Sequence, residues 1–169
     1  MTTAPLTVSR VFKAPVALVW AAYTESAHQA KWLSPGNPDA YMSRMDFRVG
    51  GKHFYGSPGP DGAMMYGVQT FREIVPLTRV VLVQSFTDKD GNVAPHPMAP
   101  TWPREMLSTN EYADLGDGTT RLQVTWLPLD PTAEEAATFE AARGGMTGGW
   151  EHQFGQIEAY LATLSAPQT

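Results

Sequence analysis

Four histidines are the side chains of this chain best suited to metal binding or proton transfer: His28, His53, His96 and His152. None has a second histidine or a carboxylate at the helical spacing that signals a zinc site, and the pattern HExxH is absent. The chain contains no cysteine, which excludes thiolate ligands and cysteine nucleophiles, and it has no GxSxG motif. We therefore expect no metal site, no cofactor and no set of catalytic residues.

Aromatic and polar side chains recur at positions that would place them together on one face of a strand, because side chains alternate along a strand. His53 and Tyr55 lie two residues apart and so share a face. Tyr66, Val68 and Thr70 repeat this spacing in the next predicted strand. Such residues are most simply core residues, but aromatic side chains also line apolar small-molecule pockets, so both interpretations stay open.

A wide apolar stripe runs along the last predicted helix, which covers Met146–Leu164. Its members are spaced by three or four residues, the period of one helical face. They are Met146, Trp150, Phe154, Ile157, Leu161 and Leu164. A stripe this broad and aromatic requires a broad apolar partner, so we expect a sheet that curls around this helix.

A separate helix is predicted just before the last one. It should open at Thr132, with Glu135 at capping-box spacing, and the glycines of Arg143-Gly144-Gly145 should break or kink it. Gly148 and Gly149 each weaken a helix, so their presence suggests that backbone or an aromatic ring packs close to them.

Seven strand-like segments supply the apolar partner of the last helix, and two short helices, 15–24 and 26–32, follow the first strand. The strands are predicted at 6–12, 41–48, 52–56, 63–75, 79–87, 105–113 and 119–127. The predicted fold class is α+β, with a curved antiparallel sheet wrapped around a long C-terminal helix. We expect one domain, 1–169, with an ordered core of about 5–164.

A proline-rich segment, Asp88–Arg104, interrupts the run of strands. Four of its residues are prolines, which cannot donate a hydrogen bond to a ladder, so a long loop is expected. The loop carries His96, Met98 and Trp102. It is either a packed surface loop or a lid over a binding site.

Composition excludes several classes of protein. Twelve lysines and arginines against 17 aspartates and glutamates give a net charge of −5, whereas nucleic-acid binders need clustered cations. No segment approaches the roughly 18 apolar residues of a membrane span, and the N-terminus lacks a signal-peptide pattern. We expect a cytoplasmic protein that binds neither nucleic acid nor membrane.

Five segments in order, covering nearly the whole chain, are similar to one family. They read RVFKAPVALVWAAYTESAHQAKW (10–32), MDFRVGGKHFY (45–55), YGVQTFREIVPLTRVVLVQSF (66–86), GTTRLQVTW (118–126) and MTGGWEHQFGQIEAYL (146–161). They resemble START-like (SRPBCC) domains, and more closely the branch named after the activator of the ninety-kilodalton heat-shock protein ATPase. The second segment resembles the Asp-x-Arg-x-Gly-Gly strand pair of that branch. No matched motif is catalytic, so the resemblance is specific for fold.

The resemblance implies a helix-grip fold with an apolar cavity between the sheet and the C-terminal helix, which relatives use for lipids, aromatic polyketides or hormones. We therefore expect this chain to bind a small hydrophobic molecule, lipid-like or aromatic. His53, Tyr55 and Tyr66 would supply the polar contacts. The candidate cavity-lining residues are Trp20, His53, Tyr55, Tyr66, Met106, Trp126, Met146 and Trp150.

Two other functions stay open. An enzyme could act in the same cavity, with His53 or a tyrosine as the general acid. A chaperone-associated interaction protein is the alternative that the family name suggests. The namesake of the branch has a further N-terminal domain, whereas the first predicted strand here begins within a few residues of Met1, which argues against a chaperone partner. The sequence permits a homodimer without predicting one.

Overall fold

Seven strands form one antiparallel sheet in the order β1-β7-β6-β5-β4-β3-β2. The computed structural model describes residues 3–59 and 61–165. The strands are β1 (Leu6–Phe12), β2 (Met42–Met45), β3 (Lys52–Pro58), β4 (Met64–Val75), β5 (Arg79–Thr87), β6 (Met106–Asp114) and β7 (Thr120–Pro128). All seven predicted strands are present, and β2 is shorter than the predicted segment 41–48.

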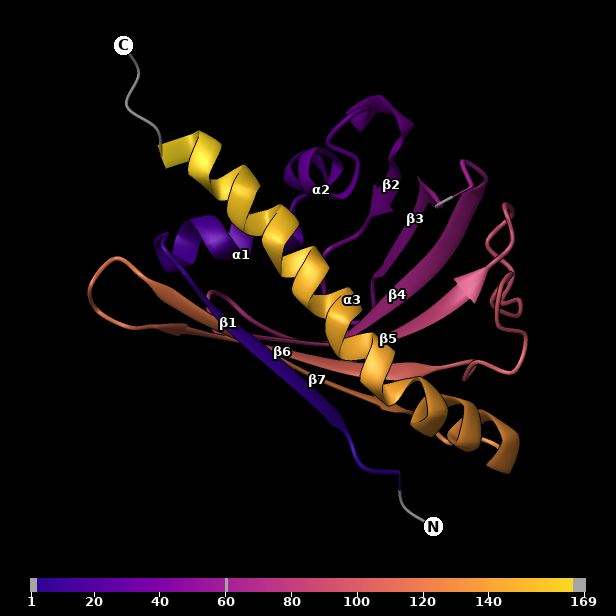
Figure 1. The fold of residues 1–169 in the computed structure, drawn as a ribbon. Coiled ribbons are helices and arrows are strands. Elements are labelled where there is room, and N and C mark those ends of the chain that lie inside the picture. The colour runs from indigo at the N-terminus through magenta and orange to yellow at the C-terminus, as the bar shows by residue number, and fades with distance from the viewer. Residues whose placement is uncertain (1–2, 60, 166–169) are drawn as a thin grey trace.

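Helices cover one face of this sheet. The short helices α1 (Val16–Thr24) and α2 (Ser26–Leu33) follow β1, and a single turn of 3₁₀ helix, η1 (Pro38–Ala40), precedes β2. The long helix α3 (Ala133–Ser165) crosses the concave face, with α1 and α2 beside its C-terminal half (Figure 1). The arrangement confirms the predicted α+β helix-grip fold. Within the described residues, no helix combines the length and apolarity needed to cross a membrane.

The C-terminal region is one continuous helix of 33 residues, so the predicted break at 143–145 is wrong. Packing on both sides of the glycines explains the difference, because tertiary contacts outweigh local helix propensity. Phe139, before them, is fully buried against Trp102, and Phe154, after them, is fully buried against Phe12. Thr132 caps the helix, since its hydroxyl accepts a hydrogen bond from the Glu135 backbone at 3.1 Å.

The side chain of Arg10 explains how α3 is held along the edge strand β1. It points from β1 towards the helix, where its guanidinium lies 2.6 Å from Glu151 and 3.3 Å from Glu158. The same guanidinium sits over the Phe154 ring, which meets Phe12 edge to face. These contacts clamp the middle of α3 to the β1 side of the sheet.

Two tyrosines lie flat over glycines on the paired strands β3 and β4. Tyr55 stands opposite Gly67, and Tyr66 stands opposite Gly56, on the other face of the sheet. A Cβ atom at Gly67 would lie 2.5 Å from the Tyr55 hydroxyl oxygen, and one at Gly56 would lie 2.8 Å from the Tyr66 ring. The glycines therefore leave the space that the rings occupy, an arrangement that also fixes strand register.

Gly148 and Gly149 of α3 have no such role, so the expectation of close packing there is wrong. A Cβ atom at either position, or at Gly144, would have no heavy atom within 4 Å, apart from the local helix backbone. These residues lower helix propensity without gaining a contact in return.

We predict that Gly67→Ala destabilises the protein by about 1–3 kcal/mol, because the new methyl group would collide with Tyr55. The matched control is Gly144→Ala, which adds the same methyl group in open space on a helix and should stabilise by up to about 1 kcal/mol. Urea unfolding measures both changes. Equal effects of the two substitutions would contradict the tyrosine-over-glycine packing.

Candidate functional site

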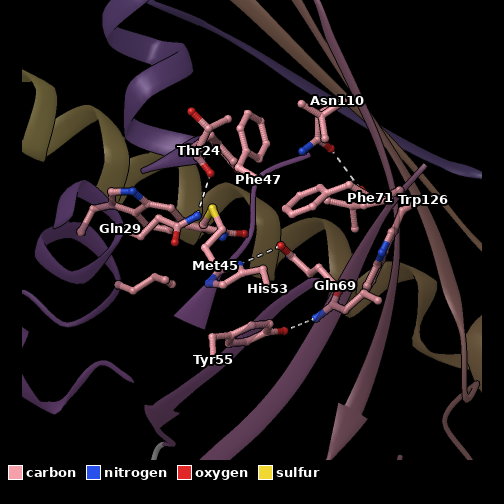
Figure 2. A pocket seen from close by; sticks show the side chains of 18 of the residues that line it. Thr24, Gln29, Met45, Phe47, His53, Tyr55, Gln69, Phe71, Asn110 and Trp126 are labelled. Atoms are coloured by element: carbon pink, nitrogen blue, oxygen red, sulfur yellow. Dashed lines mark hydrogen bonds between the residues drawn. The ribbon is translucent and has the colours of Figure 1, made fainter. Parts of the chain in front are cut away.

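A cavity of about 390 Å³ lies between the sheet and α3. Its floor consists of inward-facing side chains of β3 to β7, and its other walls come from α1, α2, the segment around β2, and α3 (Figure 2). This volume falls within the usual range of small-molecule sites, which are concave and mostly apolar. The largest apolar lining side chains are Trp32, Phe47, Phe71, Trp126 and Trp150.

Five of the eight predicted residues line this cavity: His53, Tyr55, Trp126, Met146 and Trp150. The two tryptophans meet edge to face, with ring centroids 5.7 Å apart, and so join the sheet to α3 at one side of the cavity. Trp20, Tyr66 and Met106 do not line it.

Strand register accounts for the misplaced tyrosine. Because Gly67 stands opposite Tyr55, the inward side chains of β4 are Gln69 and Phe71. Tyr66 therefore lies on the outer face, where its ring stacks on Phe54 at 6.1 Å.

The other two residues lie in filled parts of the core. Trp20 sits behind the cavity wall, where its ring packs against the lining residues Phe47 and Tyr112 at 6.0 and 5.0 Å. Met106 faces inward but lies at the start of β6, where it is 2% exposed and belongs to the packed core. Trp20 is thus separated from the cavity by one layer of side chains, and Met106 lies at the end of its strand, beyond the cavity.

His53 is the centre of a hydrogen-bonded group in the cavity wall. Its side chain is buried, and the Nδ1 atom lies 3.1 Å from the amide oxygen of Gln69 (Figure 2). The Nε2 atom lies 2.9 Å from the hydroxyl of Ser43, which lies 2.6 Å from the hydroxyl of Ser26. With the amide of Gln69 oriented in this way, Nδ1 carries the proton and Nε2 accepts from Ser43.

Burial lowers the pKa of His53 below its ordinary value, and the hydrogen bond to Gln69 opposes this effect only in part. The imidazole is therefore neutral at pH 7, which agrees with one donating and one accepting ring nitrogen. Both nitrogens are already engaged by protein groups. His53 is thus arranged to hold the wall rather than to pass a proton to a ligand.

Tyr55 and Gln84 form a second polar contact on the floor of the cavity. The amide of Gln84 donates to the Tyr55 hydroxyl at 2.5 Å, and burial raises the pKa of this tyrosine to about 12. Tyr41 similarly donates to the side-chain oxygen of Gln29 at 2.9 Å. These phenols are neutral at physiological pH.

Two further tyrosines line the cavity without a partner for their hydroxyl groups. Tyr23 comes from α1 and Tyr112 from β6, and in the described part of the chain neither hydroxyl oxygen has a hydrogen-bond partner, although both are fully buried. Burial raises the pKa of both, and the closeness of Tyr23 raises that of Tyr112 further.

Several lining residues were missed from the sequence. Gln69, Gln84, Ser108 and Asn110 sit on strands at the same inward positions as apolar residues, and nothing in their type marks them as interior. The available signal was an even spacing from large apolar residues of the same strand: Gln69 from Phe71, Gln84 from Leu82, and Ser108 and Asn110 from Tyr112. It becomes informative only once the inward face of each strand is known.

Among residues 3–59 and 61–165, no aspartate, glutamate, lysine or arginine lines the cavity. In the described part of the chain, no group of three or more histidine, cysteine, aspartate or glutamate side chains could hold a metal ion. The cavity can therefore offer apolar contact and neutral hydrogen bonds, but no fixed charge.

The proline-rich loop, 88–104, does not line the cavity. His96 packs against Phe86, Met98 is 71% exposed, and Trp102 packs against the outer side of Trp126 at 5.7 Å. Of the two alternatives for this loop, the structure favours a packed surface loop, which supports the cavity wall from behind.

Comparisons with known proteins agree with this architecture. The family model described as Activator of Hsp90 ATPase homolog 1-like protein matches residues 13–162. A comparison with curated proteins gave no match.

Solved structures with the same fold come from several bacteria. A protein of Mycobacterium smegmatis is 23% identical with a TM-score of 0.74, covering 99% of this chain and 94% of its own. One from Arthrobacter aurescens is 23% identical with a TM-score of 0.73, covering 95% and 87%. One from Nitrosomonas europaea is 22% identical with a TM-score of 0.71, covering 99% of both chains. At these identities the likeness concerns the fold alone.

We predict that His53 makes the stability of the protein depend on pH. Its folded-state pKa is lowered from the ordinary value of 6.5, so the unfolded chain binds the proton more readily. The contribution of His53 to the free energy of unfolding is therefore complete above pH 6.5 and declines as the pH falls below that value. Thermal unfolding of His53→Gln between pH 7.5 and about pH 5 should show a smaller loss of stability than the wild type.

His152→Gln is the matched control for this measurement, because His152 is exposed on α3. Its profile should follow the wild type over the same interval. A His53→Gln profile that also followed the wild type would mean that His53 is not held neutral by its surroundings.

Proposed function

The chain belongs to the Activator of Hsp90 ATPase homolog 1-like family, and we propose that it binds a small, largely apolar molecule in the cavity between the sheet and α3. The observation that carries this proposal is a concave, mostly apolar pocket of about 390 Å³ between the sheet and the helix. Its volume lies in the range of small-molecule sites and is far larger than one water molecule. A largely apolar ligand bound there would remove its apolar surface from water and gain dispersion contacts with the lining.

The aromatic side chains of the lining support an apolar ligand. Trp126 and Trp150 meet edge to face at one side of the pocket, and Phe47 and Phe71 meet edge to face at 5.0 Å. Rings held in this way supply large contact area without further loss of side-chain freedom. Met146 adds an adaptable side chain at the α3 side.

The polar groups of the cavity favour binding over catalysis. Catalysis by a general acid requires a group within reach of the ligand whose pKa lies near the working pH. Here His53 is neutral with both nitrogens engaged, and burial raises the pKa of Tyr55 to about 12. Neutral, already bonded groups orient a ligand and stiffen the wall.

Native mass spectrometry of freshly purified protein is the direct test of this proposal, with a denatured portion of the same sample for comparison. We expect a reproducible small-molecule mass that is lost on denaturation. Extraction of a sample into organic solvent, followed by mass analysis, identifies the compound class.

We predict that Ser108→Leu weakens binding roughly 5- to 150-fold, equivalent to about 1–3 kcal/mol, because the larger side chain intrudes into the cavity. The matched control is Thr109→Leu, the next residue of β6, which points to the outer face of the sheet. Quenching of tryptophan fluorescence by an apolar naphthalene fluorophore measures both affinities, since Trp126 and Trp150 line the cavity. Binding that is equally strong in both variants would place the ligand elsewhere.

A further inference from the structure

Gln69 and Gln84 form a pair of neutral amide side chains on the inner face of the sheet. They stand directly opposite each other on β4 and β5, and both line the cavity. Residues paired in this way have Cβ atoms about 5 Å apart on one face of a sheet, so the two amide groups reach the same part of the cavity. Both residues are only partly buried, although they face the interior.

Each amide uses one end to bond to the cavity wall and leaves its other end without a protein partner. The Gln69 oxygen accepts from His53 Nδ1 at 3.1 Å (Figure 2), and the Gln84 nitrogen donates to the Tyr55 hydroxyl at 2.5 Å. In the described part of the chain, Gln69 Nε2 and Gln84 Oε1 form no hydrogen bond, yet both are open to a water-sized group. The cavity therefore presents a free donor beside a free acceptor.

We infer that the molecule bound in this cavity carries an amide group, as in a carboxamide or a lactam, whose oxygen accepts from Gln69 and whose N–H donates to Gln84. This inference rests on the proposed function. An amide presents an acceptor and a donor side by side without a charge, which matches the two free ends of the glutamines. The bonds to His53 and Tyr55 hold the glutamines before the ligand arrives, so less side-chain freedom is lost on binding.

The lack of charge around this pair selects an amide over an ion. Among residues 3–59 and 61–165, no aspartate, glutamate, lysine or arginine lines the cavity, and burial lowers the pKa of its histidine, His53. A carboxylate bound here would be buried without an opposite charge, and one of its oxygens would face the Gln84 oxygen. An ammonium group would face the NH₂ group of Gln69 with the same lack of compensation.

The next inward pair on the same two strands orients the rest of the ligand. Phe71 stands opposite Leu82, and both line the cavity. This apolar pair lies two residues further along each strand, roughly 7 Å from the glutamines. The amide group of the ligand thus lies over Gln69 and Gln84, and its apolar body lies over Phe71 and Leu82.

Four naphthalenes of similar shape, substituted at the same ring position, test this inference. Naphthamide carries the amide, acetonaphthone has a methyl group in place of the NH₂ group, isopropylnaphthalene lacks both polar atoms, and naphthoate carries a charge. Equilibrium dialysis gives the dissociation constants for the wild type, Gln69→Met and Gln84→Met. The matched control is Gln123→Met, because Gln123 lies between buried residues of β7 and points to the outer face of the sheet.

Each substitution should affect a different set of probes. We expect Gln84→Met to weaken naphthamide roughly three- to tenfold and to leave acetonaphthone unchanged, because only the amide donates to Gln84. Gln69→Met should weaken naphthamide and acetonaphthone by a similar factor and leave isopropylnaphthalene unchanged, because both carbonyl oxygens accept from Gln69. Gln123→Met should change none of the dissociation constants.

Each other outcome of this experiment overturns a stated part of the inference. Equal losses of naphthamide and acetonaphthone in Gln84→Met overturn the hydrogen bond to Gln84. Unchanged binding of all probes in both variants overturns the amide site and leaves the proposed function standing. Tighter binding of naphthoate than of naphthamide by the wild type overturns the choice of a neutral group. Binding of none of the four probes by the wild type overturns the proposed function as well.

Nuclear magnetic resonance of the wild-type protein gives a readout that a purely structural role of Gln69 would not change. The side-chain NH₂ signals of Gln69 are assigned by their absence in Gln69→Met. They should move further downfield with naphthamide and acetonaphthone than with isopropylnaphthalene, which supplies the same ring without an acceptor. Equal shifts with all three probes contradict the hydrogen bond from Gln69.

Discussion

The attachment of α3 to one side of the sheet is the constraint on which the cavity depends. Arg10 on β1 binds two glutamates of α3, and its neighbour Phe12 packs against Phe154 of the same helix. The helix is thereby fixed over β1, while the inward side chains of β3 to β5 curl around it and line the cavity. Met146 and Trp150 of the helix stripe face the space between the helix and these strands. The position at which the helix is clamped therefore sets the distance between the two walls of the pocket.

A series of aromatic contacts connects the proline-rich surface loop to α3. Trp102 of the proline-rich loop packs on Trp126 of β7, Trp126 meets Trp150 of α3, and Trp150 contacts Phe154. The successive ring centroids are 5.7, 5.7 and 5.8 Å apart. The loop therefore supports the pocket wall without lining the pocket, because Trp102 packs against Trp126, which does line it. The carboxylate of Glu135 holds the end of this loop through the Arg104 backbone at 3.1 Å.

The polar groups of the interior fall into two kinds with different consequences. Those around His53 and Tyr55 bond to other side chains, so they cost little to bury and make the wall rigid. The hydroxyls of Tyr23 and Tyr112 have no such partners. Their oxygens are closed off from water-sized groups, so burying them carries a desolvation cost that no neighbouring side chain offsets.

The order of the elements could be predicted from the sequence, because hydrophobic periodicity, proline and glycine act locally. The seven strands, the two short helices and the apolar stripe of the last helix are all local patterns, and they are present in the structure, except that Leu164 at the end of the stripe is 43% exposed. Five lining residues followed from the same patterns. The inward face of β4 could not be derived in this way. Alternation shows which residues share a face, but pairing with β3 decides which face is inside, and it turns Gln69 inward and Tyr66 outward.

The tertiary structure alone decided three further features. The helix α3 runs through its glycines because contacts of Phe139 and Phe154 hold it on both sides. Arg10 shares the inward face of β1 with Val8 and Phe12, and the partners of its charge there are two glutamates of α3, far away in the sequence. Tyr23 and Tyr112, 89 positions apart in the sequence, meet only because α1 packs against β6. Each of these depends on residues distant in the chain, and local propensity contains no information about such partners.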